Sequence, residues 1–273
     1  MVGLAACVVC RPAGSAQGAE LTKETVEAFE RYVRLTESRI DAEVRRGTAF
    51  LWVDAQPERV RQQTYQQIKG GETVVERMQT RDAGRDIDFP GGMIHHWVAT
   101  GFVPGVTLPQ VLTLSQDYDN YQNIYRPEVQ RSKLVARDGD TFKVHLRYYK
   151  KTLVTVVLNT DNDVRYFVLG ERRAHTRSHS TRIAQVDHAG TPAEHERPVG
   201  NDSGYLWRLY IYWRFEERDG GVYLQSETVA LTRNIPFAFR WLVGPLVSRI
   251  PRETLRATIT ATRNALLARS GPP

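Results

Sequence analysis

The sequence is poor in cysteine, because Cys7 and Cys10 are the only two among 273 residues. Both lie near the start, so the remaining chain holds no disulfide and needs none to fold. Long apolar runs are missing too: after residue 20 no uninterrupted stretch reaches the roughly 18 residues of a membrane-spanning helix. A G-x-S-x-G nucleophile motif is absent, and Gly220-Gly221 has the context of a hairpin and lacks that of a phosphate-binding loop. These absences argue against a disulfide scaffold, a helical membrane protein, a serine hydrolase of that motif and a P-loop enzyme.

The chain has ample material for a hydrophobic core. Apolar residues make up 41% of it and aromatic residues 10%, which suits one large domain or one domain with an extension. The formal net charge of +6 favours anionic partners in general. However, the 37 basic residues are scattered among 31 acidic ones, and no nucleic-acid recognition motif accompanies them. We therefore expect no nucleic-acid partner.

Residues 1–18 read as a targeting segment. Met1–Cys10 is short and apolar, Ala16-Gln17-Gly18 resembles a small-x-small cleavage site, and charged residues begin in earnest at Glu20. The sequence thus predicts a trimmed secretory signal and an exported protein, periplasmic or secreted. The alternatives for Cys7-x-x-Cys10 are a redox pair or half of a metal site, for which no second cysteine pair exists.

Residues 19–90 are predicted to form an N-terminal helical extension. Thr22–Arg46 has a capping Thr22, an apolar stripe at helical spacing and a terminating Gly47. A second helix runs from about Pro57 to Lys69, and Glu72–Thr80 alternates weakly as a strand. Both helical stripes are narrow, so we expect this region to lean on the main body.

From residue 91 onward the pattern is that of strands with short helices between the first two. Met93–Val103 is a strong strand, and Thr107 with Gln110 fits the capping box of a short helix. Turn residues at Asp161-Asn162-Asp163 predict a break between two later strands. The remaining predicted strands are Glu128–Arg137, Thr141–Lys150, Leu153–Asn159, Val164–Leu169, Ala174–Val186, Tyr205–Glu217 and Val222–Thr232.

The last third of the chain ends in a helix after two long strands. In Gly204–Arg218 large apolar side chains alternate with polar ones, which predicts one buried face. Pro251 suits the first turn of a helix, and an apolar stripe follows it at helical spacing. The predicted apolar strand face is Tyr205, Trp207, Leu209, Ile211, Trp213 and Phe215, and the helix stripe is Leu255, Ile259, Thr262 and Leu266.

This order of elements resembles the helix-grip fold of START lipid-transfer domains, polyketide cyclase-like SRPBCC proteins and Bet v 1-type plant proteins. The resemblance covers residues 91–270, about two thirds of the chain, and specifies architecture without a catalytic motif. It implies an α+β fold in which a curved antiparallel sheet grips a long C-terminal helix, with an elongated cavity between them. The segments that carry it are Ile94–Val98 leading to Pro104-Gly105, Thr107–Val111, and Leu231–Pro236 leading to Ile250–Glu253.

The implied cavity gives a set of candidate ligand-binding residues on the sheet, the cap and the helix. Packing of the sheet's apolar face against the helix stripe is expected in any case. Whether space remains is open, because aromatic side chains could fill it, whereas small residues on the facing surfaces leave room. The candidates are Phe142, Val144, Leu146, Arg182, Trp207, Leu209, Ile211, Trp213, Phe239, Trp241, Leu255, Ile259 and Thr262.

Two polar stretches invite further hypotheses. In Arg172–Arg182, alternate residues share a face, so Ser178, Ser180 and Arg182 could look inward, with Arg182 holding an anionic ligand head. The alternative is a solvated outer face. His95 and His96 point to opposite sides of their strand, so at most one of them enters a cavity, as a general base or as a structural histidine.

No catalytic residue, metal site or cofactor is assigned. His175 and His179 are separated by roughly 13 Å along a strand, too far to share a metal ion. The apolar stretch Pro236–Val243, within a cap at residues 236–247, is either a short helix over the sheet or a gate that touches a membrane transiently.

Three functions remain open. The first is binding or transport of a hydrophobic or amphipathic, lipid-like small molecule between sheet and helix. The second is a cyclase or dehydrase on the same fold. The third is an envelope interaction protein with a filled core, in which the N-terminal helices meet a partner.

Overall fold

The computed structural model describes residues 19–151, 154–234 and 240–270, and within the last helix it describes side chains from Arg249 to Arg269. The predicted signal segment and Phe239 lie outside the described residues, as does the side chain of Trp241. No helix of the described part is long and apolar enough to cross a membrane.

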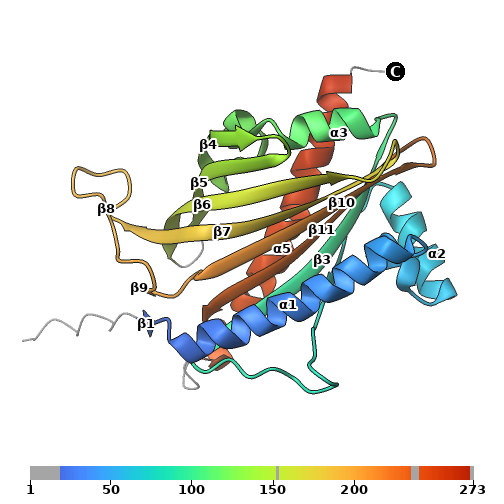
Figure 1. Cartoon of the computed structure of the whole chain (residues 1–273). Coiled ribbons are helices and arrows are strands. Elements are labelled where there is room, and N and C mark those ends of the chain that lie inside the picture. The colour runs from blue at the N-terminus through green and yellow to red at the C-terminus, as the bar shows by residue number, and fades with distance from the viewer. Residues whose placement is uncertain (1–18, 152–153, 235–239, 271–273) are drawn as a thin grey trace, which may run out of the picture.

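The described residues form a nine-stranded antiparallel sheet, a two-stranded sheet of β1 and β9, and five α-helices (Figure 1). The helices are α1 (Lys23–Arg46), α2 (Glu58–Lys69), α3 (Leu108–Ser115), α4 (Tyr121–Ile124) and α5 (Arg240–Ser270), with 3-10 turns at Trp52–Ala55 and Tyr118–Asn120. The long strands are β3 (Gly92–Pro104), β4 (Val129–Asp138), β5 (Thr141–Lys151), β6 (Thr155–Val168), β7 (Arg173–Asp187), β10 (Arg208–Arg218) and β11 (Gly221–Arg233). The short ones are β1 (Ala19–Glu20), β2 (Val74–Arg77), β8 (His195–Glu196) and β9 (Asn201–Asp202).

The main sheet is curved and carries a long helix on each face. Its strand order is β2-β3-β11-β10-β7-β6-β5-β4, with β8 added beside β7, and every pairing is antiparallel. Figure 1 shows α1 crossing one side of the sheet while α5 passes behind it. We call these sides the α1 face and the α5 face. The strand order with α5 against the sheet is the helix-grip architecture, and α1 adds a third layer to it.

Strand alternation divides the apolar residues between two cores. In β11, Leu224 points to the α5 face and packs with Ile259, whereas Val229 points to the α1 face and packs with Phe29. Burial of such side chains stabilises the fold by about 1.5–3 kcal/mol each. The helix α1 is therefore held by a core of its own on the far side of the sheet.

Local signals set several element ends as expected. The amide of Thr25 donates to the Thr22 hydroxyl at 3.3 Å at the start of α1, and Gly47 ends that helix at a φ of 68°. The capping box of Thr107 and Gln110 is present at the start of α3. The division of the chain near residue 90 stays a prediction, and in the structure β2 joins the same sheet as β3.

The predicted turn at residues 161–163 is wrong, because β6 runs through it without a break. Each polar side chain there has a partner on the neighbouring strand β5: Asp161 Oδ1 lies 2.7 Å from His145 Nδ1, the Asn162 amide donates to the carbonyl of Val144 at 3.4 Å, and Asp163 lies 3.5 Å from Lys143. Pairing with β5 and β7 thus outweighs the local turn preference of Asp and Asn.

The C-terminal helix is longer than predicted. It begins at Arg240, so Pro251 lies inside it and not in its first turn. The expected separate cap at residues 236–247 is in part the first turns of α5, joined directly to the stripe that packs on the sheet.

Candidate functional site

The helix α5 presses closely on one part of the sheet. A Cβ atom added to Gly101 of β3 would lie 2.6 Å from Cγ2 of Ile259, closer than real Cβ contacts. Leu255, Ile259 and Leu266 are buried there together with Ala99 and other β3 and β11 side chains. Only a glycine in β3 permits this approach.

Beside this contact, a group of side chains in the middle of the sheet is only half-buried. The register aligns Trp97, Thr228, Ile211 and Ser178 in one row across β3, β11, β10 and β7. All four are half-buried, as are the neighbouring Leu209, Ala230 and Trp213. We call Trp97, Thr228, Ile211 and Ser178 the half-open row, and Leu209, Ala230 and Trp213 its neighbours. The second row toward the hairpin end, Phe215 with Leu224 and Ala174, is fully buried, so the accessible region is local.

The opposite face of the same strands is filled. Tyr212, Arg214, Glu227 and Val229 each keep 1% or less of their surface exposed beneath α1. Central strands covered on both faces normally bury their apolar side chains. On the α1 face even charged side chains are buried, whereas isoleucine, leucine and tryptophan side chains on the α5 face remain partly exposed.

Strands β5 and β6 supply the far wall. Phe142, Val144 and Leu146 are buried on the α5 face in one cluster with Tyr118 and Tyr166. Helix α5 reaches this wall through Thr262, whose Oγ1 lies 3.1 Å from the Tyr125 hydroxyl. The structure thus brings nine of the predicted residues around one region: Phe142, Val144, Leu146, Leu209, Ile211, Trp213, Leu255, Ile259 and Thr262.

Five tyrosines line this wall, and one hydroxyl is left over. Tyr166 and Tyr121 both donate to the carbonyl of Ser115 at 2.6 Å, and Tyr118 bonds Tyr166 at 2.8 Å. Burial raises the pKa of Tyr125 to about 12. The Tyr148 hydroxyl has no hydrogen-bond partner anywhere in the described chain, and burial followed by the nearby Tyr125 raises its pKa well above its ordinary value.

Arg182 does not belong to this site, which corrects the prediction that it looks inward. A bulge in the β6 and β7 pairing places Ser180 opposite Asn162 but Arg182 opposite Asp161. The extra residue, Thr181, turns Arg182 to the α1 side of the sheet. There it forms ion pairs with Glu196 and Asp161.

In the rest of the Arg172–Arg182 stretch, some side chains are exposed and others form contacts with α1 or with neighbouring strands. Arg177 pairs with Asp41 of α1, and Arg173 pairs with Glu216 at 2.6 Å. His175 is buried and stacked on Phe167 at 4.5 Å between ring centroids. A fully solvated face is therefore also too simple a description.

Trp207 also lies elsewhere. Strand β10 begins at Arg208, so Trp207 precedes the alternating segment and follows the loop. Its indole Nε1 donates to Asp202 at 3.2 Å, and its ring packs with the α1-face core. The two-residue period, extended one step too far, assigned it to the wrong side.

The adjacent histidines point to opposite faces, as predicted. His95 lies on the α5 face with Nε2 3.0 Å from the Thr232 hydroxyl, and burial followed by the charge of Arg77 lowers its pKa to about 4. It is therefore neutral at physiological pH. His96 enters the interface beneath α1.

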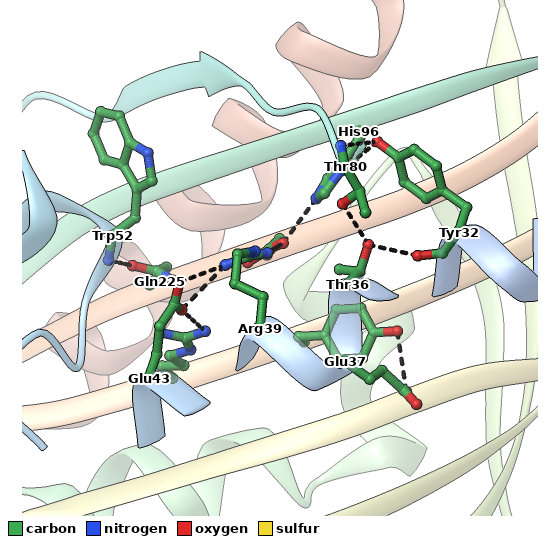
Figure 2. A network of polar contacts seen from close by, with 12 residues as sticks. Tyr32, Thr36, Glu37, Arg39, Glu43, Trp52, Thr80, His96 and Gln225 are labelled. Carbon is green, nitrogen blue, oxygen red and sulfur yellow. Dashed lines mark hydrogen bonds and ion pairs between the residues drawn. The ribbon is translucent and has the colours of Figure 1, made fainter. Parts of the chain in front are cut away.

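That interface contains a buried polar network that sequence reasoning missed (Figure 2). His96 Nε2 lies 2.7 Å from Glu227 Oε1, and its Nδ1 lies 2.8 Å from the Tyr32 hydroxyl. Arg39 of α1 bonds both Glu227 and Glu43. Burial alone would raise the pKa of Glu227, but the His96 hydrogen bond and the charge of Arg39 hold it below its ordinary value.

The network extends along α1 to β10, the central strand next to β11. Arg214 donates to Glu43 Oε2 at 2.6 Å and to the carbonyl of Phe50 at 2.6 Å. Gln225 accepts from the amide of Trp52 at 2.5 Å. Because it joins α1 and the residues that follow it to β3, β10 and β11, this network ties the layers together. The sequence signal was present, because Gln225 and Glu227 interrupt the face of the strand that also carries Tyr223, Val229 and Leu231.

Comparisons with known proteins give distant structural likenesses. The sequence matches no family model and no curated protein. The structure is similar to TTHA0849 from Thermus thermophilus, with a TM-score of 0.46, 17% identity, and coverage of 64% of this chain and 98% of that one. It is similar to a STAR-related lipid transfer protein from Xanthomonas axonopodis, with a TM-score of 0.45, 16% identity, and coverage of 66% and 95%. For the aromatase/cyclase di-domain StfQ of the steffimycin pathway the values are 0.43, 14%, 66% and 53%.

The fold is START-like, of the helix-grip kind. This assignment rests on the chain's own strand order, on the short helices α3 and α4 after β3, and on α5 against the sheet. The third layer formed by α1 is an addition of this chain to that architecture.

Proposed function

We propose that the protein binds or carries a hydrophobic or amphipathic small molecule between the α5 face of the sheet and α5. One observation carries the proposal: the half-open row and its neighbours include the partly exposed apolar side chains of Trp97, Leu209, Ile211 and Trp213, in the middle of the sheet and on the face against which α5 packs. Space beside isoleucine, leucine and tryptophan is unfavourable for water, so a molecule with apolar surface gains free energy by filling it.

The expected affinity is moderate. A ligand that buries about 300 Å² of apolar surface gains about 7 kcal/mol before association costs are subtracted. Affinities around micromolar or weaker follow, which suits a carrier that must also release its cargo.

The test is a titration of the purified protein with N-phenyl-1-naphthylamine, an uncharged dye that fluoresces in apolar surroundings. The informative variant is Ile211→Glu, because Ile211 belongs to the half-open row and is only half-buried. A carboxylate there can stay partly solvated, so the variant should fold, but its charge disfavours binding of an apolar dye. We expect the variant to bind the dye at least tenfold more weakly than the parent chain.

The matched control is Val135→Glu, the same type of change at a β4 side chain that is 62% exposed. It should bind the dye like the parent. Equal affinity of the Ile211→Glu variant, with an unchanged circular dichroism spectrum, would place the dye elsewhere and end the proposal for this site.

Export and transient membrane contact through residues 236–247 stay predictions from the sequence. N-terminal sequencing of the protein purified from its natural host would test export, since a mature chain starting near Ala19 is expected.

A further inference from the structure

The α5 face carries no charge where a ligand would lie. Six strands lie between the two edge strands of the sheet. In each of them the residues directed to the α5 face are uncharged over these ranges: Met93 to Val103 in β3, Val222 to Thr232 in β11, Leu209 to Phe215 in β10, Ala174 to Gln185 in β7, Leu158 to Tyr166 in β6 and Phe142 to Tyr148 in β5. The described sheet-facing positions of α5, such as Leu255, Ile259 and Thr262, are uncharged too.

Charged side chains on this face of the six strands stand at the strand ends and are already engaged. Lys150 lies 3.4 Å from Glu128, Glu217 accepts from the amide of Leu108 at 2.6 Å, and Asp187 pairs with Arg197. Arg77, on the edge strand β2, is exposed and stands opposite Trp97 at one end of the half-open row, without an ion-pair partner among the described residues. From Trp97 to Ser178, however, no side chain of the row or of its neighbours is charged, so a carboxylate or ammonium group buried beside Ile211 would lack a counter-charge on these strands.

The same face does offer hydroxyl groups. Thr228 and Ser178 flank Ile211 in the half-open row, and neither side chain has a hydrogen-bond partner in the described chain. Tyr148, half-buried on the far wall, is also without one. A neutral oxygen on a ligand can bond such groups without the cost of desolvating a charge.

We propose that the ligand is an uncharged, oxygen-bearing amphiphile, such as an alcohol or ketone, whose oxygen bonds the Tyr148 hydroxyl while its apolar part extends along the α5 face toward Ile211, which is in line with Phe142, six residues from Tyr148 along β5. This inference rests on the proposed function and narrows it. It replaces the expectation of an anionic head, because Arg182, the group that would have held it, faces away.

The experiment is competition against bound N-phenyl-1-naphthylamine at pH 7.5 by three probes with the same alkyl chain: dodecan-1-ol, dodecanoate and dodecylammonium. We expect the alcohol to compete at least tenfold more strongly than either ion. Tyr148→Phe removes one oxygen atom and should weaken dodecan-1-ol, relative to the dye measured on the same variant, by about two- to tenfold, the value of one hydrogen bond.

Tyr205→Phe, the same change at an exposed tyrosine, is the control and should bind dodecan-1-ol like the parent. Competition by dodecanoate or dodecylammonium as strong as that by the alcohol would overturn the neutral-ligand inference while the proposed function stands. Dodecan-1-ol binding unaffected by Tyr148→Phe would overturn the role of Tyr148. Absence of dye binding in the first step would remove the proposed function itself, so the failures are distinguishable.

Discussion

Adjacent His95 and His96 show how one step along a strand changes the chemistry of a side chain. His96 shares a buried site with an ionised glutamate, whereas His95 has only a threonine hydroxyl as partner and Arg77 nearby. The alternation that separates them was readable from the sequence. Their partners were not, because cross-strand neighbours depend on the register of β3 with β11.

The low pKa of His95 makes the protein sensitive to mild acid. In the unfolded chain a histidine takes up a proton near pH 6.5, whereas His95 in the fold does so only near 4. Its contribution to stability is thus complete above pH 6.5 and declines as the pH falls toward 4. At pH 5 the loss is about 2 kcal/mol.

We expect the His95→Asn variant to lose about 2 kcal/mol less unfolding free energy than the parent between pH 7 and pH 5, measured by urea titration. The parent also loses stability through His175, whose burial lowers its pKa to about 4, so the variant keeps part of the dependence. His188→Asn, at an exposed loop position, is the control and should reproduce the parent difference. An unchanged difference in the His95 variant would contradict a neutral His95.

Residues at irregular points were beyond prediction. Arg182 follows a bulge and Trp207 precedes the first paired residue of β10, so simple alternation assigned both to the wrong face. By contrast, Phe142, Leu209 and Ile211 lie in regular parts of their strands, where a period of two holds. The predicted face of each side chain was therefore right in the regular stretches and wrong at their ends.

Helix ends and apolar stripes could be predicted from the sequence where the signal lies in neighbouring residues. The caps at Thr22 and Thr107 and the spacing of the apolar stripe on α5 need only nearby residues. The break expected at residues 161–163 is wrong because partners on two neighbouring strands, such as His145 on β5 and Arg182 on β7 for Asp161, satisfy those polar groups. Only a long-range register could have revealed them.

The contact between Gly101 and Ile259 gives a test of how α5 grips the sheet. Gly101→Ala places a methyl group 2.6 Å from Ile259 Cγ2, so it should lower the unfolding free energy by about 1–3 kcal/mol. Ile259→Ala alone should cost about 2–5 kcal/mol by leaving a cavity.

The two changes should not add. In the double variant the new methyl group occupies space that the isoleucine has vacated, so the cost should be smaller than the sum by about 1 kcal/mol or more, measured in a double-mutant cycle by urea unfolding. Additive costs would show that α5 does not lie against β3 at this point in solution.

Considered whole, the molecule has three layers joined in different ways. Between the sheet and α5 the contacts are apolar, and several side chains beside them are only half-buried. Between the sheet and α1 they combine an apolar core with buried ion pairs, in which Glu227 meets Arg39 and His96. Buried charges of this kind contribute little net stability when paired but make separation of the layers costly.

We therefore predict that α1 and the sheet unfold as one unit. Opening α1 alone would leave Glu227 and Arg214 on an exposed sheet and strip their partners from Arg39 and Glu43, so hydrogen exchange of amides in α1 should be as slow as in β11.

Glu227→Ala leaves Arg39 and His96 without their shared acceptor and should lower the unfolding free energy by about 3–5 kcal/mol, with exchange in α1 and β11 accelerated to the same extent. Glu76→Ala, an exposed glutamate of β2, should change stability by about 0.5 kcal/mol or less. Faster exchange confined to α1 in the Glu227 variant would instead show a detachable layer, and the added helix would then be a separate unit resting on a helix-grip domain.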